Sequence, residues 1–125
     1  MKHMEKQIYI TDEERQKCKI VVKAFEELFQ ISDTAVLDAG RYGFVKLQFY
    51  TPSVGFGSAI CYTDSHLLFQ GLWDAWLFEQ LLAHVIGTPL EDVEYGDLLK
   101  LLPKEKQEEL MAKRTYFKEK CEGYI

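Results

Sequence analysis

The chain has 125 residues and a formal net charge of −5 at pH 7, from 15 basic and 20 acidic residues. This length suits one domain with one hydrophobic core, so we expect 1–125 to form a single domain with a flexible start at 1–7. With 47% hydrophobic and 28% charged residues the composition is globular, which excludes disordered and collagen-like architectures. The acidic balance argues against nucleic-acid binding, which normally needs a basic face, and favours a protein partner.

The three cysteines, Cys18, Cys61 and Cys121, are an odd number and form no CxxC pair. A small secreted scaffold would carry more cysteines in an even number, and the first residues lack the apolar segment of a signal peptide. We therefore expect a cytoplasmic protein with reduced thiols. No run of about eighteen apolar residues is present, so no membrane span is predicted.

The first predicted element is a helix that begins after Thr11 and ends near Gln30. Thr11 and Glu14 have the spacing of a capping box, in which the Thr11 hydroxyl satisfies an amide of the first turn and Glu14 reaches back to the cap. An apolar stripe at helical spacing follows: Cys18, Val21, Val22, Phe25, Leu28 and Phe29. The charged residues fall on the opposite face, as in a helix that packs along one side.

Residues 34–62 show the patterns of strands and turns. Three strands are predicted, at 34–38, from Phe44 onwards, and at 56–62. Short glycine-containing turns separate them, and such connections favour an antiparallel meander. An additional edge strand at 8–10 is compatible with the pattern.

The second strand alternates between two kinds of face. One face carries three apolar residues: Val45, Leu47 and Phe49. The other combines aromatic and polar side chains: Tyr42, Phe44, Lys46, Gln48 and Tyr50. Two interpretations stay open for this second face, since either a helix covers it or it is a protein-binding surface. Stacking of nucleic-acid bases on its rings is disfavoured by the acidic charge of the chain.

Helices follow the strands. Capping residues at 63–65 and a terminating Gly87 predict a long helix over about 65–86. A short helix at 95–102 and a last helix from Pro103 to about 122 complete the order α-β-β-β-α-α-α, which is an α+β fold. The last helix is charge-dense, with a narrow apolar stripe of Leu110, Met111, Phe117 and Cys121. It is either a solvated outer helix docked along that stripe or a detachable, partner-facing one.

The long helix is apolar nearly all round. One side carries Phe69, Leu72, Trp73 and Trp76, and another carries Leu67, Phe78, Leu82 and Val85. A helix on a protein surface keeps a polar face, so this one must be covered on most sides. Either the C-terminal helices cover it and it is the core element, or one side is a homodimer or partner interface. Aromatic residues dominate interface hot spots, which makes Trp73 and Trp76 natural anchors for the second interpretation.

Residues 61–66 are the only cluster with the residue types of a reactive site. A helix N-terminus and a nearby His66 would lower the pKa of the Cys61 thiol. Asp64 opposes thiolate formation, and helix capping already explains 63–65, so Cys61 and His66 are weak catalytic candidates. No metal-ligand or phosphate-loop spacing occurs, and we predict neither a metal nor a cofactor.

The sequence therefore favours a non-enzymatic protein-interaction or regulatory module that acts through an aromatic surface. The predicted contact residues form two patches: Phe69, Trp73 and Trp76, and Tyr42 and Tyr50. The alternative is a small-molecule-binding protein or enzyme that uses Cys61 and His66.

Overall fold

The computed structural model describes residues 9–30, 32–49, 55–88 and 95–125. Within these ranges lie the elements α1 (Asp12–Leu28), β1 (Thr34–Asp38), the 3-10 turn η2 (Gly40–Tyr42), β2 (Phe44–Phe49), β3 (Phe56–Tyr62), α2 (Ser65–Val85), α3 (Tyr95–Leu101) and α4 (Lys104–Lys120). The α+β class and the order α-β-β-β-α-α-α predicted from the sequence are confirmed.

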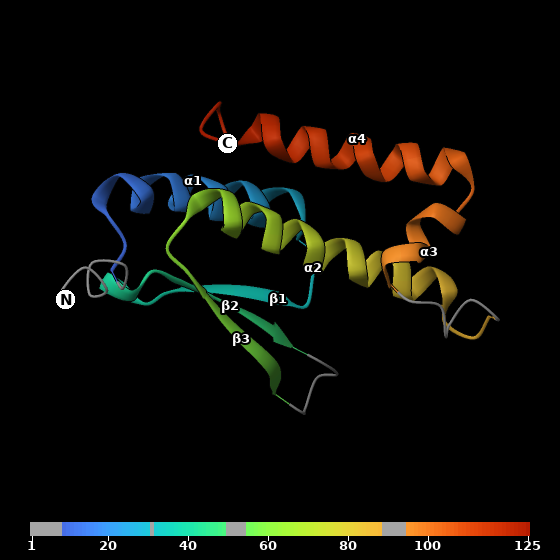
Figure 1. The fold of residues 1–125 in the computed structure, drawn as a ribbon, viewed down its shortest axis with the longest axis horizontal. Coiled ribbons are helices and arrows are strands. Elements are labelled where there is room, and N and C mark those ends of the chain that lie inside the picture. The colour runs from blue at the N-terminus through green and yellow to red at the C-terminus, as the bar shows by residue number, and fades with distance from the viewer. Residues whose placement is uncertain (1–8, 31, 50–54, 89–94) are drawn as a thin grey trace, which may run out of the picture.

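The elements form three layers. The antiparallel sheet, in the order β1-β2-β3, makes the first layer, and α1 and α2 lie beside one another on it. α4 lies on the far side of these two helices, and α3 connects it to the end of α2 (Figure 1). The hydrophobic core fills the space between α1, α2 and α4; the sheet contributes the buried Phe44, with Val36 and Tyr62 partly buried against it.

α1 begins as predicted, with one correction. The Thr11 hydroxyl accepts a hydrogen bond from the Glu14 amide at 3.1 Å, which is the first half of the capping box. The Glu14 side chain does not complete the box. Its carboxylate instead accepts from the Ser65 amide at 2.6 Å, and so joins the start of α1 to the start of α2.

The mixed aromatic and polar face of β2 is the face that the helices cover. Phe44 is buried in the core, and Lys46 Nζ donates to the Gly71 carbonyl of α2 at 3.4 Å. Gln48 Nε2 donates to the Glu79 carboxylate, also on α2, at 3.3 Å. Of the two interpretations left open by the sequence, coverage by a helix is the one that the structure shows.

The opposite face of the sheet is apolar and lies away from the helices. The strand register places on it Ala35, Leu37, Val45, Leu47, Ala59 and Cys61. All the helices that the structure describes lie on the other side (Figure 1). The polar stripe of β2 therefore faces the helices, because Lys46 and Gln48 find partners on α2, and its apolar stripe faces away from them. On that apolar stripe Leu47 is nevertheless buried and Val45 is half-buried.

α4 docks along the apolar stripe that the sequence indicated. Leu110, Phe117 and Cys121 are buried, while Met111 is exposed. The Phe117 ring stacks on Phe69 of α2, with centroids 4.4 Å apart. α4 is thus a structural part of the core, and most of its charged side chains are exposed, while Lys113 and Arg114 lie over the Phe29 and Phe69 rings.

Three predictions concern residues at or beyond the limits of the described ranges: the edge strand at 8–10, the flexible segment 1–7, and Tyr50. Ile8 of the predicted edge strand at 8–10 lies outside the described residues, and Tyr9 and Ile10 are not in a strand. Ile10 makes one backbone hydrogen bond, from its amide to the Arg41 carbonyl at 2.9 Å. The segment 1–7, predicted to be flexible, and Tyr50 also lie outside the described residues.

Candidate functional site

A hollow opens between α2 and the hairpin formed by β2 and β3, and we call it the hairpin–α2 cleft. Its volume is about 530 Å³, within the range of roughly 300–1,000 Å³ that is usual for ligand pockets. Its lining comes from β2, β3, α2 and the residue before β1: Asp33, Lys46, Gln48, Phe49, Ser58, Asp74, Ala75, Phe78, Glu79 and Leu82.

The apolar wall of the cleft lies on the side of α2 that faces away from α1 and α4. Phe78 and Leu82 are one helical turn apart and remain 44% and 40% exposed. Phe49, at the end of β2, lines the cleft with them and is also exposed. This is the second apolar side of the long helix noted in the sequence, where the core covers Val85 but leaves Leu67, Phe78 and Leu82 exposed.

Lys46 is the only basic residue among the described residues of the lining. Burial beneath α2 lowers the pKa of Lys46 below its usual value, and the nearby Asp74 carboxylate opposes that shift. The neighbouring Tyr62 is also partly buried, and both its burial and Asp74 raise the pKa of its hydroxyl. Asp74 therefore acts on two groups beneath α2, favouring the ammonium form of Lys46 and the protonated form of Tyr62.

We expect Asp74→Asn to lower both pKa values. Loss of the anion removes a stabilising charge from the Lys46 ammonium and a repelling charge from the Tyr62 phenolate, so each group loses its proton at a lower pH. Titration of the Lys46 ¹³Cε and Tyr62 ¹³Cζ resonances measures both values, with Asp12→Asn on α1 as the control. A rise in either pKa, or an equal fall with the control, would contradict this electrostatic description.

The Glu79 carboxylate fixes one end of the cleft. It accepts hydrogen bonds from Ser32 Oγ and the Asp33 amide, both at 3.3 Å, and from Gln48 Nε2 at 3.3 Å. A further donor is Thr34 Oγ1 at the start of β1, at 3.2 Å, so one half-buried side chain connects α2 to β1, to β2 and to the segment before β1. A carboxylate on a largely apolar helix needs such donors, which are satisfied here within the chain.

The first predicted contact patch lies mostly in the core. Phe69 and Trp73 are buried, and Trp73 packs against Phe29. Trp76 is partly buried, with its ring 4.8 Å from that of Phe29. None of these residues lines the hairpin–α2 cleft, because they lie on the side of α2 that faces α1 and α4.

The second predicted patch is only partly described, since Tyr50 lies outside the described residues. Tyr42 is not on a strand but at the end of η2, where it is exposed. Its ring packs edge-on against Tyr9 at 5.7 Å, and the Arg41 guanidinium lies over both rings. Tyr42 is thus at the opposite end of the hairpin from the cleft.

Cys61 and His66 are both exposed, one on β3 and the other in the first turn of α2. The Cys61 thiol donates to the Tyr42 carbonyl, and in the described part of the chain no hydrogen bond joins it to His66. The other two thiols, Cys18 and Cys121, are buried. Burial raises the pKa of Cys18 to about 12 and that of Cys121 to about 11, which keeps both as thiols.

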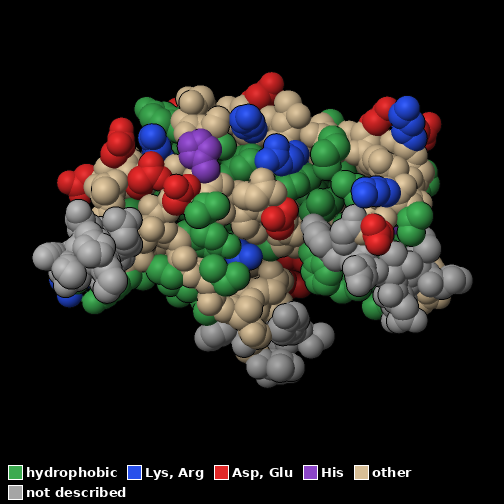
Figure 2. Space-filling view, viewed as in Figure 1, with side chains coloured by type: hydrophobic (Ala, Val, Ile, Leu, Met, Phe, Trp, Pro, Cys, Tyr) green, Lys and Arg blue, Asp and Glu red, His purple; other side chains and the backbone are tan. Residues whose placement is uncertain are grey.

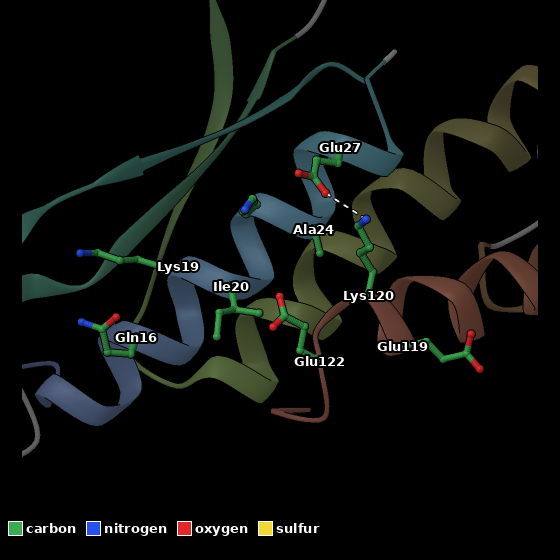
Figure 3. Close-up of a pocket in the computed structure, with 9 residues that line it drawn as sticks. Gln16, Lys19, Ile20, Ala24, Glu27, Glu119, Lys120 and Glu122 are labelled. Carbon is green, nitrogen blue, oxygen red and sulfur yellow. Dashed lines mark ion pairs between the residues drawn. The ribbon is translucent and has the colours of Figure 1, made fainter.

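A second hollow, of about 430 Å³, lies between α1 and the end of α4 (Figure 3). Three basic and three acidic side chains line it: Lys19, Lys23, Lys120, Glu27, Glu119 and Glu122. Lys120 and Glu27 form an ion pair across it at 3.3 Å. Its charges balance and it has little apolar lining beyond Ile20 and Ala24, so it lacks the convergent apolar wall of the hairpin–α2 cleft.

Comparisons of the chain with protein-family models, curated proteins and solved structures find no match. Among the described residues, no group of three or more His, Cys, Asp or Glu side chains is arranged to hold a metal ion. No described helix is long and apolar enough to cross a membrane.

Proposed function

We propose that this protein is a non-enzymatic protein-interaction module whose binding site is the hairpin–α2 cleft. The observation that carries the proposal is the exposed apolar wall of Phe78 and Leu82, which Phe49 joins in a hollow of binding-site size. Apolar side chains left exposed in a concave surface are typical of sites that bury an apolar group of a partner.

The charges around the cleft favour a basic partner. Among the lining residues that the structure describes, Asp33, Asp74 and Glu79 stand against the single Lys46, a net formal charge of −2, and the whole chain carries −5. Opposite charge on the partner speeds encounter and fixes orientation, while the apolar wall supplies the buried contact. We therefore expect the occupant to be a segment of another protein with an aromatic or aliphatic side chain next to Lys or Arg.

Selection from a library of random peptides displayed on phage tests this proposal. We expect enriched peptides to combine an apolar anchor with a basic residue. Phe78→Asp should weaken their binding by about tenfold or more, because it puts a charge in the apolar wall. Leu67→Asp is the matched control, since Leu67 is an exposed residue of the same helix outside the cleft, and should leave affinity unchanged.

Fluorescence polarisation with a labelled selected peptide also distinguishes the contribution of charge to the affinity from the contribution of apolar packing. Lys46→Met removes a positive charge from the lining and is expected to strengthen binding of a basic peptide, whereas Asp74→Asn is expected to weaken it. The proposal fails if no peptide is enriched, or if the enriched peptides bind Phe78→Asp as tightly as the wild-type protein.

A further inference from the structure

β3 is an edge strand of seven residues, and β2 is its one neighbour in the described part of the chain. The residues in its middle, 57–61, are all exposed. The backbone of an edge strand presents alternate N–H and C=O groups outward, which can pair with another strand. Figure 2 shows hydrophobic side chains gathered on this side of the molecule, beside β3 and below the first half of α2.

The sequence of β3, FGSAICY, contains no charged residue and no proline. Edge strands of monomeric proteins usually carry such residues, because charge and proline prevent pairing with other chains. The opposite edge of this sheet differs. β1 ends at Asp38, whose carboxylate accepts from Arg15 of α1 at 2.9 Å, so a helix side chain and a charge occupy that edge.

We propose that β3 pairs antiparallel with β3 of a second copy of this chain, across a twofold axis, and so forms a six-stranded sheet. Two copies that each carry −5 associate only where like charges do not face one another, and β3 offers seven uncharged residues for that contact. A twofold axis matches the outward donors and acceptors of one copy with those of the other, because the same strand supplies both sides.

Full overlap of the two strands determines the register. The middle residue, Ala59, then lies opposite Ala59 of the second copy, and Ile60 lies opposite Ser58. These three side chains are exposed in the single chain. The hairpin–α2 cleft lies on the face of the sheet toward the helices, and the two sites adjoin at Ser58, which lines the cleft and lies opposite Ile60 of the second copy. The apolar wall of the cleft, Phe78 and Leu82, is on α2 and takes no part in the strand pairing.

Native mass spectrometry and light scattering test the proposal. The wild-type protein is expected at twice its 14.6 kDa chain mass at micromolar concentration. Ile60→Lys places like charges close together across the axis and should raise the dissociation constant of the dimer by about tenfold or more. An equimolar mixture of Ile60→Lys and Ile60→Glu should restore the dimer as a mixed species.

Two controls locate the contact. Leu37→Lys, at an exposed position on the opposite edge strand, should leave the dimer intact. The double variant Cys61→Ser/Ala59→Cys should form a covalent dimer on oxidation. The double variant Cys61→Ser/Leu37→Cys, with its new thiol on the opposite edge strand, should not. A monomeric wild-type protein, or a dimer that Leu37→Lys weakens as much as Ile60→Lys, would overturn the proposal. Phe78→Asp is expected to remain dimeric, so failure here is distinguishable from failure of the proposed cleft.

Discussion

Phe117→Ala is expected to lower the free energy of unfolding by about 3–5 kcal/mol, which is the usual cost of removing a fully buried aromatic ring. The Phe117 ring contacts Phe69 at 4.4 Å and Phe29 at 5.2 Å between centroids, and Phe25 at 6.0 Å. It therefore connects α4 to both α1 and α2. Loss of the ring leaves a cavity at the point where the three helices meet, and the fully buried neighbours have little room to close it.

Urea denaturation followed by circular dichroism measures this effect. Tyr116→Ala is the matched control, because Tyr116 is the preceding residue of α4 and its ring is exposed. We expect the control to change stability by about 0.5 kcal/mol or less. Equal effects of the two substitutions would mean that α4 is a detachable outer helix, which was the alternative left open by the sequence.

Gly43→Ala is expected to lower the free energy of unfolding by about 3 kcal/mol or more. Gly43 has φ 103° and ψ −146°, a backbone conformation close to the region that only glycine adopts readily. A Cβ at this position would also overlap the Tyr62 carbonyl oxygen, a backbone atom of β3. The residue next to Gly43 begins the pairing of β2 with β3, so a displacement here disturbs the register of the hairpin.

Gly40→Ala is the control that measures the cost of the backbone conformation without the cost of the steric overlap. Gly40 also has a positive φ, 65°, but a Cβ added there would meet no atom within 4 Å. We expect it to cost about 1–2 kcal/mol. If the two alanine variants unfold at the same denaturant concentration, then the chain at the end of η2 does not lie as close to the end of β3 as described.

The elements themselves were predictable because each depends on neighbouring residues. The long helix was expected over 65–86 and is found over Ser65–Val85, since its cap and its terminating glycine are local signals. The strands at 34–38 and 56–62 have the predicted bounds for the same reason. The antiparallel order follows from turns too short for any other connection.

Which face of a strand or helix packs against the rest of the protein was harder to predict, because it depends on residues that are distant in the sequence. Alternation in β2 separates Lys46 and Gln48 from the apolar residues, but it does not say which set meets the helices. Their partners, Gly71 and Glu79, lie 25 and 31 positions away along the chain. The same limit explains Glu14, whose partner is Ser65 rather than the adjacent cap.

The cleft could be predicted only in part. The excess apolar surface of the long helix was visible in the sequence, including the side with Phe78 and Leu82. Which side remains exposed depends on where α1 and α4 pack, and they cover Phe69 and Trp73. An aromatic residue looks the same in the sequence whether it lies at an interface or in a core, so the sequence alone does not tell which of these places Trp73 and Trp76 occupy.

The measurement that tests the central claim most directly is a ¹H–¹⁵N correlation spectrum recorded during titration with a library-selected peptide. Binding in the hairpin–α2 cleft predicts that the largest shift changes map to Lys46, Gln48, Ala75, Phe78 and Leu82. Changes concentrated instead around Tyr42, on α4, or along the outer edge of β3, with the cleft residues unmoved, would contradict the assignment of the cleft as the binding site.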